Sequence, residues 1–414
     1  MSRYIVLIFS LFAILYLGST NIGPLSIRNI CILGLIVFLF VSYKEVSVDI
    51  CGKLYCLYLA ILLLASIISG NFNNPVFFKS FLSYHISSIA LLLALPLLIK
   101  SITDINVVTI FVVVVQFVDC VVSFMQFYNI PLGWQIGLAI NPGALVRLTD
   151  AEYYLSQSDV LLSRSIVFGI TSFVVSNGYY LTTFLPIASR HLLYDGAKLN
   201  NKMMSLCLLT ISVLAIFMVQ QRMAFFLMLC YVLFVIYMRI KKSLLSKLIL
   251  LITAIVFIGL YTFPTDIEMG RLTLDKVGSD SRMNQLTNVI NFMNTDSFIW
   301  GADLNDSILG DSIGHNTLTD SLRRGGFITF LFYLPLFIAV LYKSIYIGIA
   351  SQRINAPYTF AFSVSCVIYL AYSFTHSTGL QSGAVQFWFV YALMISSWRY
   401  ENDDLEEPNQ ITTK

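Results

Sequence analysis

The residues best suited to chemistry lie at the end of the longest polar interval of the sequence, where His315 and Asn316 precede a basic pair. A neutral imidazole can take a proton from a hydroxyl group, so His315 is a candidate general base. Asn316 is a preferred residue at a helix N-terminus, and Gly326 is suited to breaking a helix. The spacing therefore predicts a short helix from Asn316, whose N-terminus would attract anions and favour the neutral form of His315.

Four arginines are candidates for binding an anion. A guanidinium group stays charged and binds phosphate oxygens through two parallel hydrogen bonds, so several that converge would form a site for a diphosphate. The alternative for each one is an interfacial anchor whose side chain extends toward the lipid headgroups. The four residues are Arg164, Arg222, Arg282 and Arg324.

Composition assigns the whole chain, residues 1–414, to a single all-α, polytopic integral membrane domain. Hydrophobic residues make up 57% of the sequence and charged residues 11%, with a mean hydropathy of +0.80. Soluble domains carry about 25% charged residues. The net charge of +3 is dispersed over short loops, which excludes a nucleic-acid-binding stripe. The seven cysteines fall in or beside apolar runs and have neither zinc-site nor disulfide spacing.

Apolar runs of about 20 residues predict about twelve transmembrane helices, because a helix satisfies its own backbone hydrogen bonds in lipid. The first run follows Arg3 without a cleavage site and is expected to be a retained anchor. The seventh and eighth are separated only by Gln220 and Gln221. The runs lie near residues 4–19, 24–43, 51–70, 76–99, 104–128, 166–189, 203–220, 222–239, 246–263, 326–349, 357–376 and 383–400.

The orientation follows from lysine and arginine, which short loops retain on the cytoplasmic side. Both chain termini are then cytoplasmic, as is the acidic tail, residues 401–414. Two longer loops, residues 129–165 and 264–325, lie on the extracytoplasmic side, and the second contains His315 and the predicted short helix. The four arginines lie on the same outer side, where the bias in loop charge does not account for them.

Other ionisable residues fit this outer site less well. His85 lies inside the fourth run and His191 at a cytoplasmic end, so both are expected to be packed or interfacial side chains. His376 faces outward and stays a candidate. Asp119, within the fifth run, is costly in lipid and therefore a functional candidate, but the sequence does not identify its partner.

An ordered set of short motifs resembles the bacterial O-antigen ligase and O-antigen polymerase superfamily. Asn316 and Gly326 belong to the first motif, in which a His-Asn pair is followed by nine residues, a glycine, two more residues and a glycine, threonine or tyrosine. Three further segments are similar to the family's pattern, although Gln221 stands where a serine is usual. They are Arg164 to Gly169 with Asn177 to Leu181, Gln221 to Ala224, and Arg282 followed by Trp300 and Gly301.

The resemblance implies a metal-independent glycosyltransferase without a cofactor, acting at the periplasmic face of the bacterial inner membrane. Its donor would be an undecaprenyl-diphosphate-linked glycan of lipopolysaccharide or related polysaccharide biosynthesis. His315 would be the general base, supported by Asn316 and Gly326, and the four arginines would bind the donor diphosphate. Its partners would be the lipid bilayer and, in the same pathway, a flippase and a chain-length regulator.

The acceptor stays open between two reactions. A polymerase extends the chain onto another lipid-linked repeat, whereas a ligase transfers the glycan to the lipid A core. The acidic, polar stretch Asp303 to Gly314 suits the binding of sugar hydroxyls and favours the polymerase. Rival functions of other classes are a polysaccharide flippase or another secondary transporter, and a non-catalytic assembly partner.

Overall fold

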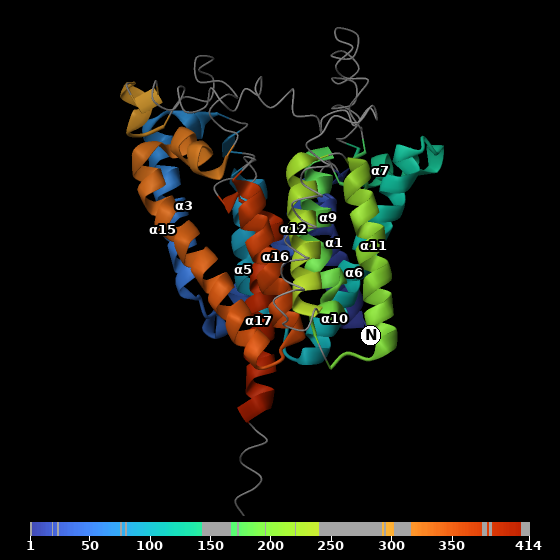
Figure 1. Cartoon of the computed structure of the whole chain (residues 1–414). Helices are drawn as coiled ribbons and strands as arrows, with labels where there is room; N and C mark the ends of the chain where they lie inside the picture. Colours follow the sequence, from blue (N-terminus) through green and yellow to red (C-terminus); the bar gives the residue numbers. More distant parts are fainter. Residues whose placement is uncertain are drawn as a thin grey trace, which may run out of the picture. The chain divides into compact units, whose positions relative to one another are not determined.

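The chain forms α-helices almost throughout the part that the computed structural model describes, which confirms the predicted all-α class (Figure 1). Strands β1 (Asn21–Ile22) and β2 (Leu25–Ser26) form a short antiparallel pair. The described residues are 2–18, 20–22, 25–74, 77–78, 81–142, 167–171, 174–194, 196–219, 221–239, 292–293, 295–301, 316–374, 379–380 and 383–406.

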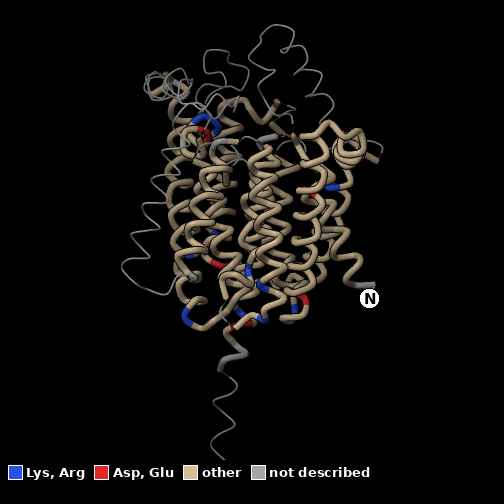
Figure 2. The backbone as a smooth tube through the Cα atoms, turned by 45° about the vertical axis from the view of Figure 1, so that its right-hand side comes forward, with Lys and Arg blue, Asp and Glu red and all other residues tan. Residues whose placement is uncertain are grey.

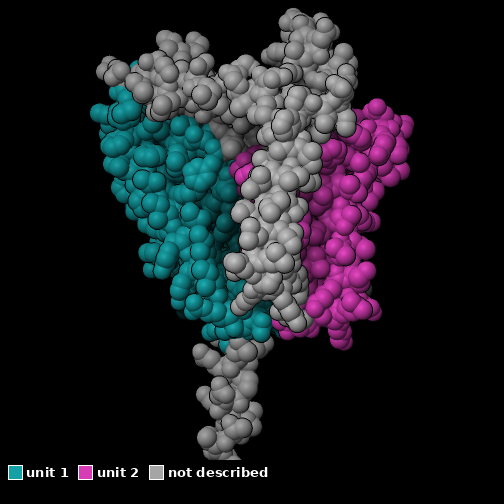
Figure 3. Space-filling model, viewed as in Figure 1, with its two compact units in different colours: residues 1–15, 27–107, 281–414 teal, residues 16–26, 108–280 magenta. Residues whose placement is uncertain are grey.

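Contacts divide the chain into two compact units (Figure 3). Unit 1 comprises residues 1–15, 27–107 and 281–414, and unit 2 comprises residues 16–26 and 108–280. Helix α6 (Ile102–Phe127) begins in unit 1 and continues in unit 2. Unit 1 contains α1 (Ser2–Tyr16), α2 (Ile27–Val41), α3 (Ile50–Ile68), α5 (Ser87–Leu98), α15 (Thr317–Arg353), α16 (Pro357–Ser373) and α17 (Val385–Glu406), with η1 (Tyr43–Glu45), η2 (Asn71–Asn73), the π-helix η3 (Phe81–Ile86) and η7 (Asp296–Phe298). Unit 2 contains α7 (Pro131–Ile140), α9 (Val174–Ala188), α10 (Arg190–Leu193), α11 (Leu199–Val219) and α12 (Arg222–Arg239).

Five described helices are long and apolar enough to cross a membrane: Ile50–Ile68, Phe81–Leu98, Ile102–Phe127, Leu199–Val219 and Thr317–Arg353. Three shorter helices are also apolar, Tyr4–Tyr16, Ile27–Val41 and Met223–Met238. Few charged residues interrupt the described helices (Figure 2). Large apolar side chains such as Phe40 and Val41 are exposed, as expected for surfaces that contact lipid. The membrane character is thereby supported, while the number of about twelve spans and their orientation stay predictions.

Two helix boundaries differ instructively from the apolar runs. The sixth run was predicted to begin near residue 166, but α9 begins at Val174 because Val167 to Thr171 are non-helical. The tenth run lies inside α15, which begins at Thr317, before the apolar stretch itself. The predicted separation of the seventh and eighth runs is confirmed, since α11 ends at Val219 and α12 begins at Arg222. The ninth run, 246–263, lies outside the described residues.

Aromatic side chains fill the core of unit 1, where α15 packs against α3 and α16, and α17 packs against α5 and α16. Tyr55 and Trp388 are fully buried, with ring centroids 4.4 Å apart. Tyr58 of α3 lies 5.5 Å from Tyr333 of α15 between ring centroids. Large aromatic surfaces of this kind pack α3, α15 and α17 together.

The acidic stretch near the C-terminus begins inside a helix and contributes to its packing. Both carboxylate oxygens of Glu401, on α17, accept backbone hydrogen bonds at the start of α16, from Tyr358 N at 3.2 Å and Thr359 N at 2.8 Å. These are N–H groups that the first turn of a helix cannot satisfy internally. Glu401 therefore caps α16, and residues 407–414 lie outside the described part.

Asp49 joins three helices of unit 1 at one end of α3. Its Oδ2 atom accepts from Lys343 Nζ of α15 and from Tyr391 OH of α17, each at 2.6 Å, while Oδ1 caps α3 through Gly52 N at 2.9 Å. Burial raises the pKa of the Asp49 carboxyl, but these three hydrogen bonds and the Lys343 charge outweigh burial, so the pKa lies below its ordinary value. The carboxylate form therefore stabilises the folded state.

We predict that Asp49→Asn lowers the free energy of unfolding by about 1 to 3 kcal/mol near pH 7, because a neutral amide loses the charged pairing with Lys343. A depressed pKa contributes stability above the unfolded-state value of about 3.9, and that contribution disappears as pH falls through the folded-state value. Equilibrium unfolding in mixed micelles between pH 3 and pH 7 should show the difference between wild type and variant shrinking below about pH 4. Glu45→Gln, which alters an exposed carboxylate of η1, is the control and should change neither quantity. A pH-independent difference would contradict the assignment.

Candidate functional site

The predicted site residues fall into three groups. His315, Arg164 and Arg282 lie outside the described residues. Arg222 is the first residue of α12 in unit 2, and only its backbone is described. Asn316, Arg324 and Gly326 lie together at the start of α15 in unit 1. Convergence of the arginines with His315 therefore stays a prediction, and the described part of the candidate site is the start of α15.

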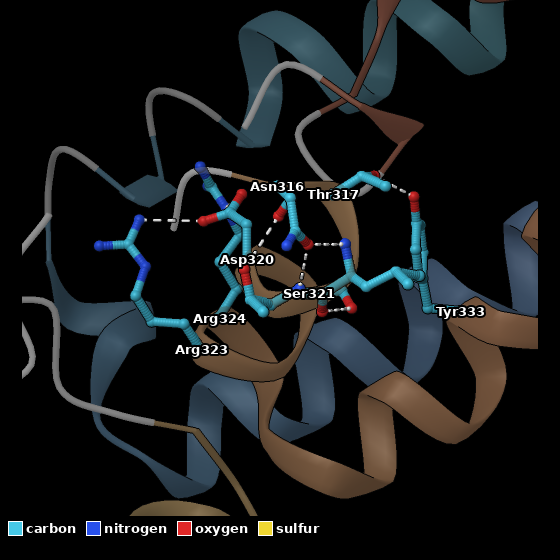
Figure 4. Close-up of polar contacts among 9 residues, drawn as sticks. Asn316, Thr317, Asp320, Ser321, Arg323, Arg324 and Tyr333 are labelled. Carbon is cyan, nitrogen blue, oxygen red and sulfur yellow. Dashed lines mark hydrogen bonds and ion pairs between the residues drawn. The ribbon is translucent and has the colours of Figure 1, made fainter. Parts of the chain in front are cut away.

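Asn316 is the N-cap of α15, as predicted. Its extended backbone (φ −130°, ψ 160°) lets Oδ1 accept hydrogen bonds from Leu318 N at 3.0 Å and Thr319 N at 2.9 Å. The side chain of Asn316 thus satisfies two N–H groups that have no partner within the helix. Thr317 follows and shares a hydrogen bond with the Tyr333 hydroxyl, both groups being fully buried. The beginning of α15 is consequently fixed by polar contacts on two sides (Figure 4).

Gly326 breaks α15 in the predicted place. Its backbone (φ 69°, ψ −171°) lies in a region that side chains disfavour. A Cβ atom there would collide with Ile299 O and Gly301 N, and one at Gly301 (φ 95°) would lie 2.9 Å from Arg324 O. Ile328 N donates to Ile299 O at 3.3 Å across this contact. The two glycines therefore let the Trp300-Gly301 segment and the kink of α15 meet backbone to backbone.

Asp320 holds two arginines one turn before the kink. Its side chain is 0% exposed; one carboxylate oxygen accepts from Arg323 Nη2 at 3.0 Å and the other from Arg324 Nε at 2.7 Å. The arginine side chains are 19% and 24% exposed. Each arginine uses one nitrogen in this cluster, so further N–H groups of both are unused within it (Figure 4). We call Asp320, Arg323 and Arg324 the arginine cluster.

The carboxylate is what allows two cations to lie close together in a mostly buried place. Two like charges about 5 Å apart repel by about 3 kcal/mol at an effective dielectric constant of about 20. One carboxylate between two guanidinium groups offsets this repulsion and leaves one positive charge. The arginine cluster is therefore suited to an anion that accepts several hydrogen bonds, such as a phosphate.

His85 is packed in the core of unit 1. It belongs to the π-helix η3, is 4% exposed, and its Nδ1 atom lies 3.0 Å from Tyr55 OH. The prediction that His85 is a packed residue is confirmed. Its separation from the outer site stays a prediction, because His315 lies outside the described residues.

Asp119 has the partners that the sequence did not identify. It is fully buried in α6, and Oδ1 accepts from Ile170 N at 2.9 Å in the non-helical segment Val167 to Thr171. With its amide nitrogen turned toward Asp119 Oδ2, at 3.1 Å, Asn177 of α9 also accepts from Ser123 Oγ at 3.0 Å. Non-helical backbone within an apolar bundle requires internal partners of this kind.

Gln126 binds the same non-helical segment, and we call Asp119, Gln126 and Asn177 together the clamp. Its Oε1 atom accepts from Phe168 N at 2.9 Å and Gly169 N at 2.8 Å, and its Nε2 atom donates to Gly169 O at 3.0 Å and Gly133 O at 3.2 Å. Gly169 has φ 57°, and a Cβ atom there would collide with Asp119. Asp119, Gln126 and Asn177 together thus provide hydrogen-bond partners for the non-helical backbone before α9.

Motif segments that are far apart in the sequence meet within each unit. In unit 2, a Cβ atom on Gly178 would lie 3.2 Å from side-chain atoms of Gln221 and Ala224, so α9 closely approaches the segment that begins α12. Asn177 contacts Gly169 on the other side. In unit 1, the Trp300-Gly301 segment contacts Gly326. The described residues contain no group of three or more histidine, cysteine, aspartate or glutamate side chains that could hold a metal ion.

We predict that Gly326→Ala lowers the free energy of unfolding by about 2 kcal/mol or more, because it adds both backbone strain and a collision with Ile299. Gly70 (φ 79°, ψ −7°) is left-handed with open space around it, so Gly70→Ala measures the strain of a left-handed residue without a collision, about 1 to 2 kcal/mol. Gly34 lies in α2 with nothing nearby, and Gly34→Ala should be neutral or stabilising. Equilibrium unfolding in mixed micelles ranks the three variants by their loss in the free energy of unfolding. Equal losses for Gly326→Ala and Gly70→Ala would refute the close backbone contact at Gly326.

A second prediction concerns the clamp before α9. Gln126→Leu removes four hydrogen bonds to backbone groups and leaves Phe168 N and Gly169 O without the partner that Gln126 gave them, so it should lower the free energy of unfolding by about 2 kcal/mol or more. Gln116 is the matched control, because it is equally buried in α6 but donates only to Leu181 O and Ser212 Oγ, while its Oε1 atom has no partner. Gln116→Leu should cost less in the same unfolding measurement. An equal or larger cost at Gln116 would show that the clamp contributes no special stability.

The comparisons with known proteins add no relative. The sequence matches no protein-family model and no curated protein. The resemblance to the O-antigen ligase and polymerase superfamily therefore rests on the ordered motifs alone.

Proposed function

We propose that this chain is a glycosyltransferase of the bacterial inner membrane that polymerises undecaprenyl-diphosphate-linked repeat units at the periplasmic face. The observation that carries the proposal is the arginine cluster, a buried carboxylate holding two arginines directly after the Asn316 cap and before the Gly326 kink. It combines the family-like motif with side chains suited to a diphosphate. The closeness of Trp300-Gly301 to Gly326 is a second support, since these belong to separate motifs.

The reaction requires a leaving group and a base. The bond between the anomeric carbon and the diphosphate oxygen breaks, and its electrons leave with the diphosphate. The acceptor oxygen bonds to the anomeric carbon, and its proton passes to His315 as general base. Arg164, Arg222, Arg282 and Arg324 stabilise the negative charge that develops on the diphosphate. Asn316 orients the backbone next to His315, and Gly326 sets the direction of the membrane helix that follows.

The finer topology belongs to the same proposal. About twelve helices span the membrane with both termini in the cytoplasm, so the loops 129–165 and 264–325 are periplasmic. The donor's polyprenyl chain lies against lipid-facing helices. A flippase would deliver the lipid-linked repeat and a chain-length regulator would limit the product. The acidic stretch Asp303 to Gly314 favours a lipid-linked sugar acceptor, and transfer to the lipid A core is the alternative.

One observation favours a function of another class. Asp119 and its partners surround an interrupted segment before α9, and transporters use interrupted helices with buried polar groups as binding sites. A polysaccharide flippase is therefore the second candidate. The clamp differs from an open binding site because Asp119 and Gln126 are occupied by hydrogen bonds to the backbone.

We predict that His315→Ala abolishes polymer formation in a strain that lacks the native gene, because the acceptor hydroxyl loses its base. The measurement is the ladder of surface polysaccharide on a gel, with protein amount checked by immunoblot. His191→Ala, in α10 of unit 2, is the matched control and should give a full ladder.

The products that accumulate in the strain without the gene also separate a polymerase, a ligase and a flippase. A single repeat attached to the core indicates a polymerase, whereas loss of all core-attached polymer with accumulation of lipid-linked chains indicates a ligase. Lipid-linked repeats trapped on the cytoplasmic side indicate a flippase. A full-length ladder from His315→Ala would end the general-base assignment.

A further inference from the structure

Asp320 is the unusual member of the arginine cluster. An acidic residue in the first turn of a helix is ordinarily an exposed side chain that interacts with the helix dipole. Asp320 is instead fully buried, and its two carboxylate oxygens are divided between two arginines. Helix stabilisation alone requires neither burial nor two cationic partners.

The role of Asp320 depends on whether its carboxylate weakens or strengthens the binding of an anion. Its negative charge by itself repels an anion, so removing it would strengthen binding if the arginines stayed in place. Without it, however, two guanidinium groups would repel each other in a place of low polarity. Long arginine side chains then turn toward water and lose their common orientation. Loss of orientation outweighs the gain in charge, because bidentate binding depends on the guanidinium plane.

We propose that Asp320 is a positioning residue that holds Arg323 and Arg324 as a paired site for the diphosphate group of the donor. This inference rests on the proposed function and extends it in two ways. It adds Arg323 to the diphosphate-binding residues, and it assigns the orientation of both arginines to a carboxylate that does not touch the substrate. Two guanidinium groups on one carboxylate match the two linked phosphates of a diphosphate better than they match a single phosphate.

The neighbouring side chains support a fixed geometry. Arg324 is held through Nε, the nitrogen nearest its aliphatic stem, which leaves both terminal nitrogens outside the bond to Asp320. Arg323 is held through a terminal nitrogen instead. Thr317, three residues before Asp320, is hydrogen-bonded to the buried Tyr333, which packs against the buried Tyr58 of α3. The helix that carries the cluster is thus packed into the core of unit 1.

The test measures binding of farnesyl diphosphate to the purified full-length chain in nanodiscs of neutral lipid. Asp320→Asn should weaken binding about tenfold, the order expected when a charge-assisted hydrogen bond is lost. Asp320→Glu, which keeps the charge and can still reach residues three and four positions on, should stay within about threefold of wild type. Wild type should prefer farnesyl diphosphate to farnesyl monophosphate, and Asp320→Asn should lose this preference. Inorganic pyrophosphate as a second probe separates binding of the headgroup from binding of the lipid chain.

Asp104→Asn is the matched control. Asp104 is also buried in the first turn of a helix of unit 1, where Oδ2 accepts from Lys100 N at 2.7 Å, far along the chain from the arginine cluster. This variant should lower the unfolding temperature and leave diphosphate affinity unchanged. If Asp320→Asn does not fold, Arg323→Lys and Arg324→Lys, which keep the charge but lose the planar fork, should each weaken binding about tenfold.

Three results would overturn the inference: unchanged or tighter binding by Asp320→Asn, equal weakening by Asp104→Asn, or no diphosphate binding by wild type. Failure of the proposed function looks different. In that case His315→Ala would keep its full ladder while diphosphate binding still depended on Asp320. Conversely, an inactive His315→Ala together with an unaffected Asp320→Asn would remove the positioning role alone.

Discussion

The constraint on which this structure depends is that a buried polar group inside an apolar helix bundle must find its partner within the protein. Lipid offers no hydrogen bonds, and an unpaired polar group in it costs several kcal/mol. Three aspartates answer this constraint in the same manner, each at a helix start or at a broken segment. Asp49 caps α3, Asp119 holds the interruption before α9, and Asp320 lies in the first turns of α15. Carboxylates are thus the organising groups of the described bundle.

The partners of these carboxylates separate structural from chemical roles. Asp49 pairs with one lysine and a tyrosine, so its charge is balanced and the result is a connection between helices. Asp119 receives backbone and amide hydrogen bonds, and the result is a held loop. Of the three, Asp320 takes two guanidinium groups, which leaves an excess positive charge among the described side chains of this cluster. An excess charge in a buried place is costly unless an anion offsets it, and this asymmetry is the physical basis for proposing an anion site at the start of α15.

The sequence predicted the structural features that depend on residues close together in the chain. Runs of apolar residues located the long described helices but not α7, which lies in the predicted loop 129–165. The Asn316 cap and the Gly326 break follow from the preferences of asparagine and glycine. What depends on tertiary partners was not predictable. Val167 to Thr171 are apolar enough to continue a helix, and the interruption is stabilised by hydrogen bonds with Gln126, Asp119 and Asn177. The burial of Asp320 likewise arises from packing that no local pattern records.

The spacing between Asn316 and Gly326 has a geometric cause in this fold. The nine residues Thr317–Gly325 form a helical segment about 13 to 14 Å long, at 1.5 Å per residue. One end is fixed by the cap and the Thr317–Tyr333 hydrogen bond, and the other by the contact of Gly326 with Ile299. Adding or removing one residue would rotate the arginine cluster by about 100° against one of these ends. A motif of fixed length is therefore what a rigid, doubly anchored helix requires, and it sets the direction in which the arginines are presented.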